Sequence, residues 1–136
     1  MIRFEDWPSR LATVLNAAET RRFSYGTHDC TLFAANCVFA MTGHDPAAFL
    51  RGTYRDENQA FEILNKNGGM KSAVTAALGI PCKNMRAAMR GDVAMVETKR
   101  GHALGVVDLT GARIASAGDD GLAFLPLKRG LMFWSV

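Results

Sequence analysis

The chain has 136 residues, of which 49% are apolar and 21% are charged, and a chain of this length buries roughly two-thirds of the surface that it exposes when unfolded. With 13 glycines and 4 prolines, the composition excludes collagen-like, low-complexity and disordered proteins. The longest mostly apolar run, Leu32 to Met41, is too short for a bilayer, and Met1 to Asp6 mixes charges where a secretory signal is apolar. We therefore expect no membrane span and no signal peptide.

The charge balance is mildly basic, with 16 Lys and Arg against 13 Asp and Glu, a formal net charge of +3. The basic residues form only short pairs, which are typical of a solvated surface and not of a nucleic-acid patch. Three cysteines cannot all pair with one another, and without a signal peptide we expect free thiols in a reducing compartment.

Helix-starting residues and glycines divide the first half of the chain into predicted helices. Leu11, Val14, Leu15 and Ala18 recur at helical spacing after Pro8. The segment from Phe23 to Gly26 is expected to be extended and to end in a turn. The expected helices begin near Trp7, Asp29, Asp45, Asp56 and Lys71, and the second one ends at Gly43.

From Gly91 onward the pattern changes to short runs rich in β-forming residues, separated by turn residues. Helices followed by an antiparallel meander predict an α+β fold, with N-terminal helices packed on a C-terminal sheet of about five strands. No linker or repeat divides the chain, so we expect one domain over residues 1–136. The expected strands are 92–97, 102–108, 113–117, 122–127 and 131–136.

Cys30 draws attention because of its position at the start of the second predicted helix. Unpaired N–H groups at a helix start favour a thiolate over a thiol, and Asp29 is placed to cap this helix. The alternative is that Cys30 is a small buried apolar residue. Cys37 shares a helix face with Phe33 and is expected in the core, whereas Cys82 follows Pro81 without a motif.

A cysteine nucleophile needs a base, and the chain offers three histidines. His28 is expected to have a local capping role or to be exposed, and His44 is expected on a surface loop. His102, at the start of a predicted strand, is the candidate base. The cysteines and histidines lack the paired spacing of a structural zinc site, and Gly68-Gly69 follows a helix and does not precede one. We therefore expect no metal and no cofactor.

Several segments together resemble a known family. Phe23-Ser-Tyr-Gly-Thr-His-Asp-Cys30, followed by Thr42-Gly43, resembles the active-site block of NlpC-type cell-wall cysteine peptidases. Arg90-Gly-Asp-Val resembles the start of that family's first sheet strand, and His102-Ala-Leu-Gly-Val-Val resembles the strand that carries its histidine. With Arg51-Gly-x-Tyr54 and Ala117-Gly-x-Asp-Gly-Leu, the pattern is similar to a phage and prophage branch encoded among tail-tip genes.

The resemblance implies a papain-like fold and roles for three residues. Cys30 would attack an amide of a peptidoglycan stem peptide, His102 would take the thiol proton, and Ser116 would orient the imidazole. The implied partners are peptidoglycan peptides and tail-tip or baseplate proteins. The implied location is the host cytoplasm during synthesis and then the virion tail.

Two departures from the family pattern leave the function open between alternatives. The family's histidine precedes glycine by two residues, a position that Ala103 holds here, so His102 comes one residue early. A slip of one residue on a strand turns a side chain to the opposite face unless a bulge restores it. Ser116 is also a weak orienting group. The protein is thus either a tail-associated cysteine amidase or endopeptidase, or a structural tail-tip subunit with weakened or lost catalysis. A third alternative is an α+β module with an unrelated small-molecule pocket.

Overall fold

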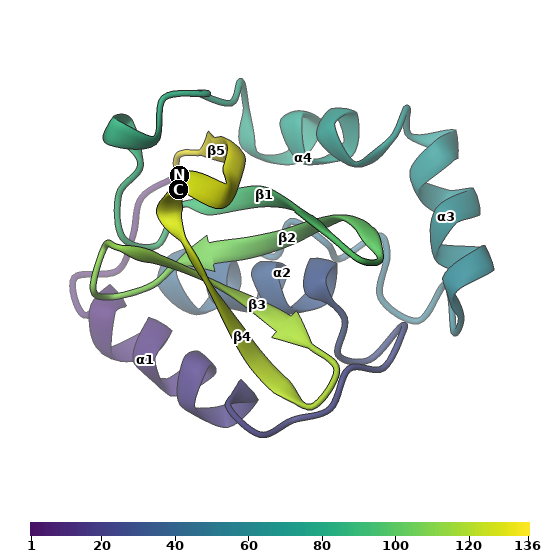
Figure 1. Cartoon of the computed structure of the whole chain (residues 1–136), viewed down its shortest axis with the longest axis horizontal. Coiled ribbons are helices and arrows are strands. Elements are labelled where there is room, and N and C mark those ends of the chain that lie inside the picture. The colour runs from purple at the N-terminus through teal and green to yellow at the C-terminus, as the bar shows by residue number, and fades with distance from the viewer.

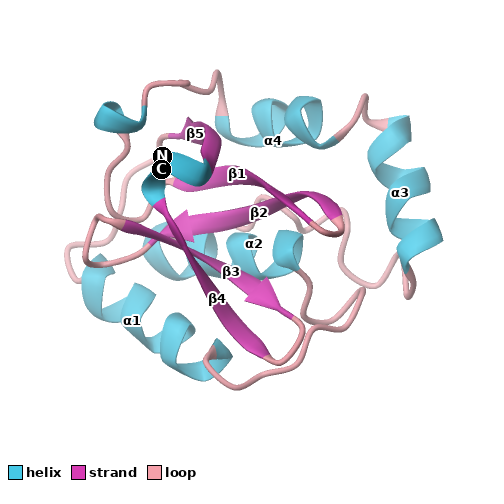
Figure 2. Cartoon of the chain, in the orientation of Figure 1, coloured by secondary structure: helices cyan, strands magenta, loops and turns pink.

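The computed structural model describes residues 1–136 and has the α+β architecture that the sequence predicts, with four helices ahead of a five-stranded antiparallel sheet (Figures 1 and 2). Two short 3₁₀ turns, Met85–Ala87 and Leu127–Arg129, flank the sheet strands. The helices are α1 (Trp7–Ala18), α2 (Cys30–Thr42), α3 (Glu57–Lys66) and α4 (Met70–Leu78). The strands are β1 (Val93–Thr98), β2 (Gly101–Val107), β3 (Arg113–Gly118), β4 (Gly121–Pro126) and β5 (Gly130–Trp134).

The sheet has the strand order β4-β3-β2-β1-β5. β1 and β2 form a regular hairpin ladder from Val93↔Val106 to Thr98↔Gly101. β2 and β3, in contrast, pair only at Val106↔Ala115 and Val107↔Ile114. The two strands therefore diverge toward the Gly101 end of β2 and leave a fork in the middle of the sheet.

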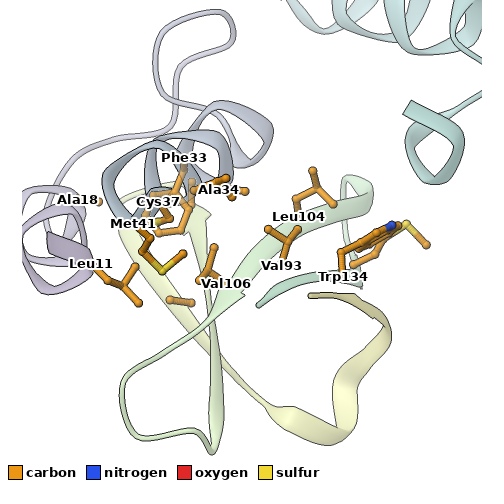
Figure 3. Packing of buried hydrophobic residues seen from close by; sticks show 14 of the residues in the cluster. Leu11, Ala18, Phe33, Ala34, Cys37, Met41, Val93, Leu104, Val106 and Trp134 are labelled. Carbon is orange, nitrogen blue, oxygen red and sulfur yellow. The ribbon is translucent and has the colours of Figure 1, made fainter. Parts of the chain in front are cut away.

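The main core lies between the sheet and the helices α1 and α2. Figure 3 shows Phe33, Cys37 and Met41 of α2 directed toward the strands, with Leu11 of α1 beside them. Val106 and Trp134 are among the sheet residues of this cluster. The buried position of Cys37 confirms the prediction that it is a core residue.

The N- and C-termini lie side by side (Figure 1). The guanidinium group of Arg3 donates to the carbonyl of Val136 at 2.7 Å and contacts the buried carboxylate of Asp92 at 3.3 Å. Asp92 also accepts from the backbone N–H groups of Met89 and Val136. One buried carboxylate thus ties both chain ends to the start of β1.

The predicted helix from Asp45 to Gly52 is wrong, because this segment is a series of turns. Its backbone hydrogen bonds join residues three apart, as in Leu50 N–H to Ala47 and Thr53 N–H to Leu50. The Asp45 carboxylate accepts from Ala47 N–H and also binds Arg51. These local side-chain bonds stabilise turns in competition with a helix. None of the four helices has the length and apolar character needed to cross a membrane.

Candidate functional site

A cleft of about 340 Å³ lies where the N-terminus of α2 meets α3 and the turn ends of the β1–β2 and β3–β4 hairpins. Its lining is chiefly apolar, with charged side chains at the rim. Small side chains of β2, β3 and β4 leave the space open: Ala103, Ser116, Ala117, Gly118 and Ala123. All three residues predicted for catalysis, Cys30, His102 and Ser116, line this one cleft.

Cys30 is the first residue of α2, as the sequence predicts, and Asp29 is its N-cap. The Asp29 Oδ1 atom accepts from Leu32 N–H at 2.9 Å, and Oδ2 accepts from Gly26 N–H at 2.9 Å. The hydroxyl group of Tyr54 also donates to Oδ2, at 2.5 Å. A single buried carboxylate thus joins the helix start, the turn before it and the turn that ends at Tyr54.

The surroundings of Cys30 as a whole favour the protonated thiol over the thiolate. Burial raises the pKa of the thiol, and the adjacent Asp29 charge raises it further, although the Leu104 backbone and the Thr31 hydroxyl act in the opposite direction. Thr31 Oγ1 is 3.9 Å from Sγ. Burial is the largest of these influences, so the pKa of the thiol of half-buried Cys30 is raised, and not lowered as its position at the helix start predicts.

Ser116 lies at the fork between β2 and β3 and has a backbone partner there. Its Oγ donates to the carbonyl of Leu104 at 2.8 Å and is buried. The Ser116 hydroxyl thus satisfies a carbonyl of β2 where β3 has diverged, and it is directed at that carbonyl and not at an imidazole.

His102 is paired with Glu97 across the β1–β2 ladder. Its Nε2 lies 3.0 Å from Glu97 Oε2, and its side chain is 52% exposed. The Cys30 sulfur has no imidazole nitrogen within hydrogen-bonding distance, because Thr31 is its only side-chain partner. The structure thus brings His102 and Cys30 to one cleft but does not bring them into contact.

The regular pleat of β2 explains this separation. Side chains alternate between the two faces of a strand, and no bulge interrupts the β1–β2 register. Leu104 belongs to the core cluster under α2, and His102, two residues away, lies on the same face of β2 as Leu104. Ala103 lies on the opposite face and belongs to the cluster against which Cys30 packs. The site therefore holds the Cys30 thiol without an adjacent base. On the side from which a base could reach the sulfur, the strand presents the methyl group of Ala103.

Charged and aromatic side chains form the rim of the cleft beside the β1–β2 turn. Lys99 Nζ lies 2.6 Å from Asp119, which Arg100 also contacts, and these two cations lower the pKa of Asp119 to about 2. The guanidinium group of Arg100 lies 4.2 Å from the centre of the Phe23 ring. These contacts tie the β1–β2 turn to the β3–β4 turn and to the segment before α2.

His28 is buried, with 2% exposure, and its two ring nitrogens have no hydrogen-bond partner. Its ring packs edge-on against Phe33, with centroids 6.1 Å apart. The prediction of a capping or exposed role is therefore wrong, because the Ser24–His28 bridge turns the side chain inward. His44 and Cys82 are exposed. No three potential metal-binding side chains of the chain come together.

The sequence reasoning missed the roles of Tyr54 and Glu97. Tyr54 belongs to the Arg51-Gly-x-Tyr54 motif, and its distance of 25 residues from Asp29 hides their contact. Glu97 could have been found from the hairpin register, because residues 97 and 102 flank a short turn symmetrically. In both cases the missing information was which segments lie side by side.

Neither a curated protein nor a solved structure matches this chain. A family model described as "Domain of unknown function (DUF6950)" matches residues 2–136. Since the match covers nearly the whole chain, the protein belongs to the DUF6950 family.

Proposed function

We propose that this protein is a papain-like, NlpC-type subunit of a phage tail tip or baseplate in which hydrolysis is lost or strongly weakened. The observation that carries this proposal is the separation of the thiol from a base. His102 pairs with Glu97, and Ala103 lies on the face against which Cys30 packs. A thiol whose pKa is raised by burial is a poor nucleophile at neutral pH without a base to take its proton.

The order of elements supports the papain-like part of the proposal. A cysteine at the start of a helix, followed by an antiparallel sheet whose second strand carries the histidine region, is the arrangement that the sequence resemblance implies. The Arg51-Gly-x-Tyr54 motif meets the Asp29-Cys30 motif through one hydrogen bond. Segments that resemble the family at separate places in the sequence thus form a single site.

A second candidate function is cysteine-dependent cleavage of peptidoglycan stem peptides during cell-wall penetration. The observation that favours it is that Cys30, His102 and Ser116 line the same cleft. The His102 side chain is half exposed, so it can change rotamer if its contact with Glu97 breaks. Catalytic contacts can tighten when substrate binds.

Incubation with purified peptidoglycan distinguishes the two functions. We expect the wild-type protein to release no more stem peptide than Cys30→Ala, measured by mass spectrometry of the soluble fraction. Release that requires both Cys30 and His102 would establish the hydrolase instead. Mass spectrometry of purified virions tests the tail location, and absence of the chain from particles that carry all other tail proteins would contradict it.

The variant Ala103→His tests whether a missing base explains inactivity. The Ala103 side chain is 7% exposed in the cluster beside Cys30, so the larger ring costs about 1–3 kcal/mol of stability. In a Cys82→Ser background, we expect Ala103→His to speed alkylation of Cys30 at pH 7, because the imidazole can accept the thiol proton. His102→Ala is the control and should leave the rate unchanged. A folded Ala103→His protein with the wild-type rate would argue against this explanation.

A further inference from the structure

We propose that Tyr54 is a positioning residue for the Cys30 thiol, and that it acts through the carboxylate of Asp29. The inference rests on the proposed site and takes Cys30 as the reactive group of the cleft, as the second candidate function does. It does not depend on whether the protein cleaves a peptide bond. Tyr54 does not contact the sulfur by a hydrogen bond, so its effect is indirect.

The contacts of Asp29 make this effect specific. Tyr54 is buried, and its hydroxyl group is one of two donors to Asp29 Oδ2, the other being Gly26 N–H. Asp29 Oδ1 holds the first turn of α2 through Leu32 N–H. Removal of the hydroxyl group leaves Oδ2 with one donor and frees the carboxylate to turn, although the cap bond at Oδ1 can persist.

The charge of Asp29 lies next to the thiol in sequence and in space. Its negative charge disfavours a thiolate at Cys30 and so raises the pKa of that thiol. Hydrogen-bond donors to a carboxylate stabilise and spread its charge. Loss of the Tyr54 hydroxyl group therefore leaves a less compensated charge beside the sulfur, and the thiolate should form less readily.

Tyr54 itself keeps its proton under the conditions of such a test. Burial raises the pKa of its hydroxyl group, and the hydrogen bond to Asp29 raises it further. The group thus remains a donor throughout the pH range in which a thiol titrates. The pH dependence of Cys30 reactivity consequently reports the thiol and not the ionisation of Tyr54.

The test is the pH profile of Cys30 alkylation by iodoacetamide, in which the thiolate attacks the CH₂ carbon and iodide leaves. The full chain carries Cys82→Ser, and Cys37 is buried. We expect Tyr54→Phe to move the profile to higher pH and to slow alkylation at pH 8 about threefold or more, since the rate follows the thiolate fraction. Tyr25→Phe makes the same chemical change at the rim, where the guanidinium group of Arg100 lies 5.8 Å from the centre of the Tyr25 ring, and should leave the profile in place.

Asp29→Asn provides an independent variant in case Tyr54→Phe folds poorly. Asparagine retains a capping oxygen but removes the charge, so alkylation should become faster, the opposite direction. Circular dichroism and the continued protection of Cys37 verify folding. Superimposable wild-type and Tyr54→Phe profiles, or an equal shift in Tyr25→Phe, would overturn the inference. Neither result alters the peptidoglycan test, so failure of this inference and failure of the proposed function are separate outcomes.

Discussion

Gly26 illustrates how the cleft depends on the absence of one side chain. It has φ +84°, and a Cβ atom there would lie 2.1 Å from the carbonyl oxygen of Tyr54. Its N–H donates to Asp29. The turn before α2 can approach the Tyr54 segment this closely only because residue 26 is glycine.

Gly26→Ala should therefore destabilise the protein more than a change of backbone preference alone requires. Gly52→Ala is the matched control, because Gly52 has φ +76° but no atom within 4 Å of a Cβ position. We expect the control to lose about 1–2 kcal/mol from its left-handed backbone, and Gly26→Ala to lose about 1–3 kcal/mol more from the steric clash. Urea unfolding measures both. Equal losses would show that the contact with Tyr54 relaxes freely.

At the scale of the element, α2 is positioned by a cap whose carboxylate has more than one function. Asp29 and Asp56 are both N-caps, and each accepts a backbone N–H from the residue three positions later. Asp56 is exposed, whereas Asp29 is buried and also binds Gly26 and Tyr54. Replacement of each aspartate by alanine therefore compares the loss of a cap alone, at Asp56, with the loss of a cap and of the bonds to Gly26 and Tyr54, at Asp29.

We expect Asp56→Ala to lower the free energy of unfolding by about 1 kcal/mol, the usual cost of a lost cap. Asp29→Ala should cost about 3 kcal/mol or more, because it also leaves buried donors without an acceptor. The measurement is equilibrium unfolding at neutral pH. If the two variants lost the same stability, the bonds to Gly26 and Tyr54 would contribute little to the fold.

At the scale of the whole molecule, His28 makes stability depend on pH. Burial lowers the pKa of its imidazole, and the charge of Arg21 lowers it further. Above the unfolded pKa of about 6.5, both states are neutral and the group has no effect. As the pH falls below that value, the unfolded chain takes up a proton that the folded chain resists, so the free energy of unfolding decreases.

The expected result is a wild-type free energy of unfolding that declines from pH 7 toward pH 5, and a weaker decline in His28→Leu. His44→Gln replaces an exposed histidine and should retain the wild-type slope. Urea midpoints at several pH values measure the slopes. Asp119 does not disturb this window, because the stabilisation reflected in its lowered pKa is lost only near and below pH 4. An unchanged slope in His28→Leu would mean that the imidazole is accessible to protons in the folded state.

The sequence by itself determined the α+β class, the N-cap at Asp29, the helix that begins at Cys30 and the strand that contains His102, because local caps, breakers and periodicity encode these features. It did not determine that the 45–52 segment forms turns, where side chains compete locally with a helix. Only the tertiary structure decided that His102 faces Glu97, that Ser116 bonds to Leu104 and that Tyr54 reaches Asp29. These contacts join segments far apart in the sequence or depend on strand register and divergence. Burial, which is also a tertiary property, raises the pKa of the Cys30 thiol, whereas its position at the helix start predicts a lowered pKa.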